Sequence, residues 1–155
     1  MEGIFYFHNS QYPLLQKFLN IIVSSTISEF IFLKIGPFQH GFIKGRFVLT
    51  NLLLYNDFLS TAFKNGVKVD SIYIEFSKAF DTVNYRLLLQ KVWNVGIRGK
   101  LFSWLQSYLT DRTQRVRTCG TKSYRFVSTS GFPLGSNIGP ILFILFINSP
   151  RLFTE

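Results

Sequence analysis

Thiol and imidazole groups are scarce in this sequence. Cys119 is its single cysteine, and His8 and His40 are its two histidines. One cysteine excludes an intrachain disulfide framework and a cysteine-based zinc site, because each of these needs several thiols. Two histidines so far apart in the sequence do not indicate a metal cluster. We expect an intracellular protein, in the nucleus or the cytoplasm.

Signals for export or for a membrane span are also missing. The first residues, MEGI, lack the basic region and the small-residue cleavage site of a secretory signal. The best candidate for a membrane span, residues 18–33, is 16 residues long and contains Asn20, Glu29 and several serines. A spanning helix needs about 20 mostly apolar residues, so we expect this segment to be a packed helix and expect no membrane partner.

Acidic residues are few compared with basic ones. The chain has 8 Asp and Glu against 17 Lys and Arg, a net charge of +9. This excess favours an anionic partner, either nucleic acid or an acidic membrane surface, although a basic surface that meets only solvent would look the same. Hydrophobic residues make up 47% of the 155 residues, enough for the core of one domain or of part of a larger one.

Hydrophobic periodicity predicts an α+β fold. Apolar residues recur at steps of three and four in residues 47–63 and form one stripe in residues 99–109, which indicates helices, and the very apolar residues 141–147 are also expected to be helical. One segment is rich in β-branched and aromatic residues and is apolar on both faces from Ile72 to Ile74, which is typical of a central strand. The expected elements are helices at 47–63, 82–95, 99–109 and 141–147, a strand at 67–76, and a hairpin formed by 115–119 and 124–128.

Glu75 and Asp81 are the first candidates for chemistry. Glu75 stands at the end of the expected strand, where a rigid backbone would hold a carboxylate in place for a hard cation such as Mg²⁺. The alternative is that Glu75 is a solvated charge at a strand end. For Asp81 we favour a structural role, as the cap of the following helix.

Three segments together resemble the reverse transcriptases of non-LTR retrotransposons, with jockey-like insect elements the most similar. Residues 73–81 read YIEFSKAFD, where that family commonly has YLDFSKAFD. Residues 39–46, QHGFIKGR, resemble the upstream fingers block of the same enzymes. Residues 130–140, SGFPLGSNIGP, resemble their SGVPQGS block, and the three blocks stand in the family's order.

The resemblance implies a partial right-hand polymerase fold, made of part of the fingers and an incomplete palm. It implies an RNA-directed DNA polymerase that uses an RNA template, a DNA primer, dNTPs and Mg²⁺. We divide the chain into an unassigned apolar segment at 1–35, a partial reverse transcriptase domain at 36–149 and a tail at 150–155.

The same comparison indicates that catalysis is impaired. In the family an Asp stands at position 75, as catalytic residue and metal ligand, and here it is Glu75. Two further metal ligands come from a later Ala-Asp-Asp block, yet no Asp follows Asp111. We therefore expect a fragment of such a polymerase that does not polymerise by itself. The alternative is a non-catalytic fragment that binds nucleic acid, or a remnant open reading frame.

Five positions are candidates for nucleotide contacts. Leu134 replaces the family's Gln, which supports the incoming nucleotide, and leucine cannot form the hydrogen bonds of an amide. Gly135 keeps the loop geometry, and Ser136 is a suitable helix cap. Phe80 stands where the family has an aromatic ring that screens the sugar 2′ position, or it is an ordinary buried aromatic. Lys44 and Arg46 would meet phosphates, or form a solvated basic loop.

A basic stretch from Arg98 to Arg125, with Asp111 as its one acidic residue, is the candidate nucleic-acid surface. Tyr124 or Phe126 would stack on a base there. The alternative is a basic surface without a ligand. The side chains that we expect to follow the phosphate backbone are Arg112, Arg115, Arg117, Lys122 and Arg125, with Arg98 and Lys100 in the same stretch.

Overall fold

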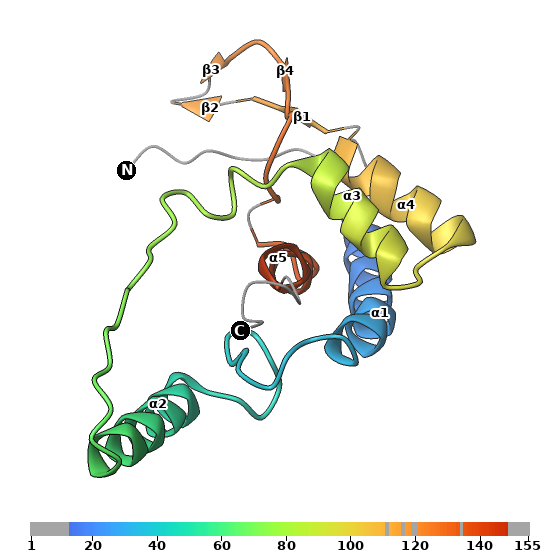
Figure 1. The fold of residues 1–155 in the computed structure, drawn as a ribbon. Helices are drawn as coiled ribbons and strands as arrows, with labels where there is room; N and C mark the ends of the chain where they lie inside the picture. Colours follow the sequence, from blue (N-terminus) through green and yellow to red (C-terminus); the bar gives the residue numbers. More distant parts are fainter. Residues whose placement is uncertain (1–12, 111, 116, 119–120, 134, 149–155) are drawn as a thin grey trace.

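The computed structural model describes residues 13–110, 112–115, 117–118, 121–133 and 135–148 (Figure 1). These ranges combine helices with small two-stranded sheets. In chain order the elements are α1 (Pro13–Phe32), α2 (Val48–Lys64), α3 (Tyr85–Asn94), α4 (Gly99–Thr110), β1 (Thr113–Gln114), β2 (Arg117–Thr118), β3 (Thr121–Lys122), β4 (Phe126–Val127) and α5 (Gly139–Ile147).

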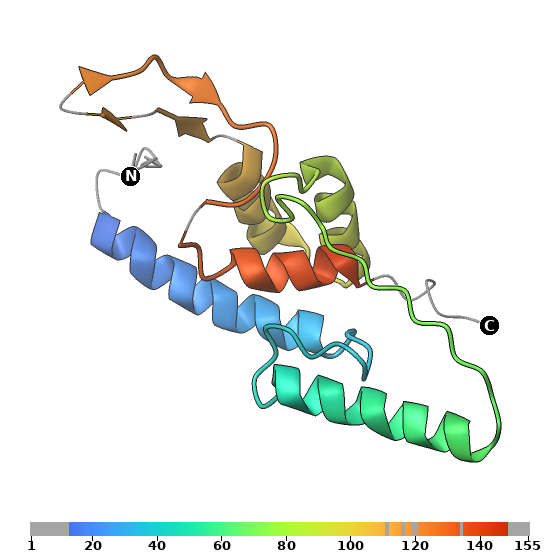
Figure 2. The ribbon, with the colours of Figure 1, turned by 90° about the vertical axis from the view of Figure 1, so that its left-hand side faces the viewer.

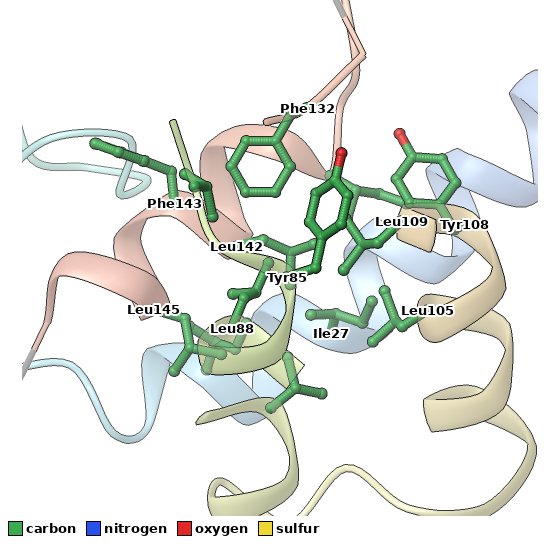
Figure 3. Close-up of a cluster of buried hydrophobic side chains, with 14 of the residues drawn as sticks. Ile27, Tyr85, Leu88, Leu105, Tyr108, Leu109, Phe132, Leu142, Phe143 and Leu145 are labelled. Carbon is green, nitrogen blue, oxygen red and sulfur yellow. The ribbon is translucent and has the colours of Figure 1, made fainter. Parts of the chain in front are cut away.

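Helix α5 lies at the centre of the core. Its sequence, GPILFILFI, is apolar on every side, which is the pattern of a helix surrounded by protein. Helices α1 and α3 both contact α5, and α4 packs against α3 (Figures 1 and 2). Figure 3 shows the side chains that converge between these helices, among them the fully buried Leu88, Leu105, Leu109 and Leu142.

Helix α1 confirms the expectation that residues 18–33 form a packed helix. Ile27 and Ile31 are fully buried and belong to the same core cluster as α5. The other side of α1 is apolar but exposed, with Phe18 and Ile22 each more than 60% accessible. No helix within the described ranges has both the length and the apolar character that crossing a membrane requires.

Helix α3 starts three residues later than its sequence pattern predicts. The Asn84 side chain accepts a hydrogen bond from the Leu87 amide at 3.2 Å and so caps the first turn. The prediction that Asp81 caps this helix is therefore wrong. Asp81 is exposed in the turn that precedes Asn84, and its amide donates to the Lys78 carbonyl oxygen. Asparagine is as good a cap as aspartate, and it stands next to the helix.

The expected hairpin is confirmed, but its strands are short, and β1 and β3 lie outside the predicted strand bounds of 115–119 and 124–128. Strand β1 pairs antiparallel with β4, with Thr113 opposite Val127. Strand β2 pairs antiparallel with β3, with Arg117 opposite Lys122. Cys119 and Gly120, at the expected turn, lie outside the described residues.

The predicted strand at 67–76 is wrong in this structure. The segment is extended, but its residues 68–76 form no backbone hydrogen bond with any described residue, and no strand lies beside it (Figures 1 and 2). Ile72 and Tyr73 are 86% and 82% exposed. A sequence pattern indicates that a segment can enter a sheet, whereas pairing also needs a neighbouring strand.

Helix α2 is confirmed close to its predicted bounds, but it lies away from the core. Ala62 is its only buried residue, and α2 contacts no other helix or strand of the described part of the chain. Its link to the extended segment is polar. The Tyr55 hydroxyl is hydrogen-bonded to the Ser71 hydroxyl and accepts from the Tyr73 hydroxyl at 3.2 Å.

The packing of α1 leads to a first prediction. Replacing Ile27 by Ala removes a fully buried side chain, and we expect it to lower the free energy of unfolding by about 2–5 kcal/mol. Ile22→Ala is the matched control, because Ile22 is 62% exposed and its truncation should change stability by less than about 0.5 kcal/mol. Urea denaturation followed by circular dichroism measures both. Equal losses would mean that α1 is not part of the core.

Candidate functional site

Two segments about 50 residues apart in the chain are joined by hydrogen bonds. The Gly131 amide donates to the Val83 carbonyl oxygen, and the Phe132 amide donates to the Phe80 carbonyl oxygen, each at 3.1 Å. The Ser130 hydroxyl donates to the Asp81 carbonyl oxygen at 2.7 Å. Residues 80–83 and 130–132 therefore form one junction. This junction joins the end of the 73–81 block to the start of the 130–140 block.

Gly131 lets the two backbones approach this closely. Its φ of +75° lies in the left-handed region. A Cβ atom added there would lie 2.7 Å from both the Cα and the carbonyl oxygen of Asp81, and 2.8 Å from the Phe80 carbonyl oxygen. These contacts are with backbone atoms, which cannot move aside as a flexible side chain can. Any other residue at position 131 would force the segments apart.

Arg112 and Tyr85 form buried hydrogen bonds that stabilise the junction. An Arg112 guanidinium nitrogen donates to the Gly131 carbonyl oxygen at 2.7 Å, to the Ser128 hydroxyl at 3.0 Å, and also to the Tyr85 hydroxyl. The Tyr85 hydroxyl in turn donates to the Gly131 carbonyl oxygen at 2.8 Å. Arg112 is only 4% exposed, so its guanidinium does not face a nucleic acid, and the structure does not support that predicted role.

Phe80 lies in a cluster of aromatic rings. It stacks on Phe143 with ring centres 4.5 Å apart, and it meets Phe132 and Phe42 edge to face at 6.1 Å and 5.9 Å. The ring is half-buried. These contacts support the structural alternative noted for Phe80, and they also fix the ring beside the junction, with part of its surface open.

The loop after the junction is anchored at the start of α5. The Ser136 hydroxyl accepts from the Ile138 and Gly139 amides at 3.2 Å and 3.0 Å, so it binds amides at the start of α5, but the N-cap residue of this helix is Ile138 and not Ser136 as predicted. The Ser136 hydroxyl is also hydrogen-bonded to the Tyr108 hydroxyl at 2.7 Å. Burial raises the pKa of Tyr108, so the phenol stays protonated at neutral pH.

Gly135 and Leu134 are the two remaining predicted positions in this loop. Gly135 has a φ of +73° and open space around its Cα, so its backbone conformation favours glycine although no neighbour requires it. Leu134, where the family has Gln, lies outside the described residues.

Arg46 organises the loop that precedes α2. One of its guanidinium nitrogens donates to the carbonyl oxygens of Gly36, Pro37 and Gln39 at 3.2, 3.0 and 2.6 Å. Lys44 is exposed on the same loop. Arg46 therefore shapes the loop, whereas Lys44 is exposed to solvent.

Glu75 stands alone in the extended segment. Its side chain is exposed, and nowhere in the described ranges do three or more His, Cys, Asp or Glu side chains gather as a metal site would need. Mg²⁺ prefers near-octahedral coordination that includes carboxylate oxygens from more than one residue or a substrate. The donor set within the described part of this chain does not fit that requirement.

The hairpin presents a mixture of basic and aromatic side chains. Lys122 and Arg125 are exposed, and Tyr124 is 97% exposed. Arg115 is half-buried and lies between β1 and β2. Arg117 lies in β2, although its side chain is outside what the structure describes. On the hairpin, the accessible members of the predicted surface are therefore Lys122, Tyr124, Arg125 and Phe126, and Arg98 and Lys100 in the same stretch are also exposed.

Sequence reasoning missed Tyr85 and Ser128. Both lie inside the junction network, yet Tyr85 reads as one more apolar position at the start of a helix and Ser128 as a strand end. Of this network, the sequence analysis selected only Arg112, and it interpreted the charge of Arg112 as a sign of surface exposure.

Comparison with a family model and with individual proteins gives reverse transcriptases and retrotransposon polymerases in each case. The family model for reverse transcriptase (RNA-dependent DNA polymerase) matches residues 9–151. In Drosophila melanogaster, the "Probable RNA-directed DNA polymerase from transposon BS" is 30% identical over 70% of this chain, and the corresponding protein of transposon X-element is 28% identical over 70%. The "Retrovirus-related Pol polyprotein from type-1 retrotransposable element R2" of Popillia japonica is 23% identical over 83% of the chain.

Two further findings concern the length of these relatives and the solved structures. The chain spans 12% of the length of each Drosophila relative and 18% of the Popillia relative. No solved structure matches the chain significantly.

The close approach at Gly131 generates a second prediction. Gly131→Ala and Gly135→Ala both place a side chain at positive φ, which costs about 1–2 kcal/mol in each case. Only Gly131→Ala also creates backbone clashes, and overpacking adds typically about 1–3 kcal/mol. We expect the Gly131 variant to be the less stable of the two in thermal denaturation. Similar melting temperatures for both would contradict the junction.

Proposed function

We propose, because this chain belongs to the reverse transcriptase (RNA-dependent DNA polymerase) family, that it forms part of the nucleotide- and nucleic-acid-binding region of a retrotransposon polymerase. The observation that carries this proposal is the junction between residues 80–83 and 130–132. These residues belong to two sequence blocks that resemble the family, and their hydrogen bonds bring both blocks to one place.

The proposed fold is a portion of a right-hand polymerase, with part of the fingers and part of the palm. The extended segment at 67–76 supports this proposal. From Ile72 to Ile74 it is apolar on both faces, and the backbone groups of residues 68–76 have no partner among the described residues, so the segment has the properties of an inner strand without its neighbours. In a longer polymerase, strands from elsewhere would pair with it.

The proposed reaction of the whole polymerase is extension of a DNA primer along an RNA template. It forms a bond between the primer 3′ oxygen and the α-phosphorus of a dNTP, and pyrophosphate leaves. The family uses divalent metal ions for this step, which would stabilise the negative charge that develops on the phosphate oxygens. Within this chain only Glu75 stands at a family ligand position, and it has no described partner ligand.

We propose that the chain alone does not polymerise. Glutamate keeps the charge of the family's aspartate, but its additional methylene moves the carboxylate. Misplacement by about 1 Å can lower a rate on the order of a hundredfold. Leu134 adds a second defect, because a leucine offers no hydrogen bond to a nucleotide.

Binding roles are proposed for the side chains that remain accessible. Phe80, held by three aromatic neighbours, would set the edge of the sugar pocket, and Lys44 would contact phosphate. Lys122 and Arg125 on the hairpin would follow a nucleic-acid backbone, while Tyr124 would stack on a base.

A second candidate function is nucleic-acid binding without catalysis. The observation that favours it is the contrast between two sets of residues. The junction, its glycine and the Ser136 hydrogen bonds are present, whereas the family's first metal ligand and its nucleotide-supporting glutamine are replaced. The chain therefore has the contacts that hold these loops together, while two positions expected to serve the reaction differ from the family pattern.

Primer extension tests the catalytic part. With purified chain, poly(rA)–oligo(dT), dTTP and Mg²⁺, we expect no incorporation above background, because one carboxylate cannot replace the family's ligand set. Glu75→Asp should not restore activity, since the other ligands would still be missing. An active reverse transcriptase serves as the assay control.

One result would overturn this prediction. Incorporation by the native chain that disappears in Glu75→Ala would mean that Glu75 supports catalysis. Glu75 is exposed, so its replacement should not unfold the protein and confuse the comparison.

The salt dependence of RNA binding tests the hairpin. Each lost phosphate contact should reduce the slope of log K against log salt concentration by about 1, so Lys122→Ala with Arg125→Ala should lower it by about 2. Lys64→Ala, which removes an exposed charge from α2, is the control and should leave the slope unchanged. Fluorescence anisotropy with a labelled RNA measures all three proteins. A slope that is the same in the hairpin variant would remove the hairpin from the interface.

A further inference from the structure

Helices α3 and α4 come from a stretch without acidic residues. Residues 82–110 contain no Asp or Glu and carry four basic residues, Arg86, Lys91, Arg98 and Lys100. Surface helices usually carry charges of both signs, so that their field is partly cancelled. The nearest acidic residues along the chain, Asp81 and Asp111, stand at the two ends of this stretch, and none lies within α3 or α4.

The exposed side of α3 is mainly polar and basic, although Leu87 is also 44% exposed. Its opposite side is buried in the core through Tyr85, Leu88 and Val92. Arg86, Gln90, Trp93 and Asn94 are all exposed, and their spacing of three, four and eight residues places them along one side of the helix. Arg98, in the turn before α4, and Lys100, in the first turn of α4, are also exposed.

Trp93 is held in place at the surface of this stripe. The Arg98 guanidinium lies 3.8 Å from the centre of the indole ring and donates to the carbonyl oxygens of Trp93 and Ile97. Phe102 meets the ring edge to face at 5.2 Å. Trp93 nevertheless remains 47% exposed. A large aromatic ring is thus fixed in one orientation with half of its surface open to a ligand.

Lys91 does not belong to the stripe. Its ammonium group donates to the Phe146 carbonyl oxygen and lies 5.5 Å from the centre of the Phe146 ring. Burial lowers its pKa, as expected for a lysine at a helix contact. The exposed basic side chains are therefore Arg86, Arg98 and Lys100, which precede and follow Trp93 in the sequence.

We propose that the exposed side of α3 and its turn into α4 form a binding surface for single-stranded nucleic acid. Phosphates would contact Arg86 and Lys100, and a base would stack on Trp93. This proposal rests on the proposed function and adds a contact surface to it. The tip of the hairpin, β2–β3, lies apart from α3 and α4 in both views (Figures 1 and 2), so the two surfaces would hold different parts of a strand.

The chemistry of the stripe favours nucleic acid over a membrane surface. A helix that lies on a membrane inserts an apolar face between the lipids, and the apolar face of α3 is buried against the core. The stripe itself has the amide side chains of Gln90 and Asn94 between its basic residues. Amides hydrogen-bond to bases and phosphates and contribute little to insertion into lipid.

Anisotropy with a fluorescein-labelled 20-nucleotide RNA of mixed sequence tests the charge component on the full chain. Arg86→Glu combined with Lys100→Glu should weaken binding on the order of tenfold or more at low salt. Lys64→Glu is the matched control on α2 and should bind as the native chain does. The hairpin variant with Lys122→Ala and Arg125→Ala, measured in parallel, separates the two surfaces.

Tryptophan fluorescence tests the stacking component without altering the stripe. In Trp104→Phe, Trp93 is the single remaining tryptophan, since the sequence contains two. We expect RNA to quench this emission, and we expect Trp93→Ala to weaken binding on the order of tenfold. Because the quenching is measured with Trp93 in place, it remains informative even if the Trp93→Ala variant folds poorly.

Three results would overturn the proposal. If the native chain binds RNA while Arg86→Glu with Lys100→Glu binds equally well and Trp93 is not quenched, the stripe is not an RNA surface, and the proposed function stands on the hairpin. If the native chain binds no RNA, the stripe and the nucleic-acid part of the proposed function both fail. If the charge variant loses flotation with phosphatidylserine vesicles but keeps RNA binding, the stripe is a membrane surface.

Discussion

The architecture of this protein depends on the contact of Gly131 with the backbone of Phe80 and Asp81. Without a side chain at position 131, the two segments approach closely enough for a set of backbone hydrogen bonds. The buried guanidinium of Arg112 then binds the Gly131 carbonyl oxygen from the other side. Phe80 is held against Phe143 of α5 as a result, and the junction is thereby connected to the core. A local steric requirement thus determines how distant parts of the chain are arranged.

Elements that depend on local sequence were predictable, and those that depend on distant partners were not. Helices α2 and α4 follow from their periodicity and glycine ends, and the hairpin follows from its alternating strands. The strand at 67–76 failed because pairing is a property of two segments, and its neighbour is not among the described residues. Arg112 shows the same limit for a site, since it belongs to a basic stretch of the sequence, whereas its side chain is buried by contacts with residues distant in the chain. The roles of Glu75, Phe80 and Lys44 remain predictions.

In the described site, the residues that hold the loops in place differ from those predicted to take part in a reaction. Gly131, Ser136 and Tyr85 maintain loop conformation through contacts with the backbone, and these contacts do not require a substrate. Glu75 and Leu134, which we predict at the metal-ligand and nucleotide positions, both differ from the residues that the family resemblance leads us to expect. Because packing and catalysis rest on different residues, a chain of this kind can keep its fold while its catalytic residues change. Binding surfaces made of exposed basic and aromatic side chains are independent of both.

The extended segment also has a consequence for the life of the protein in a cell. Amides at 68–76 that hydrogen-bond only to water should exchange their protons rapidly, and side chains such as Ile72 and Phe76 are accessible there to chaperones and proteases. Cleavage in this segment needs no prior unfolding of the core, so we expect the turnover of the free chain to depend on protease encounter rather than on global stability. A partner strand that covered the segment would lengthen the lifetime of the chain as well as complete its sheet.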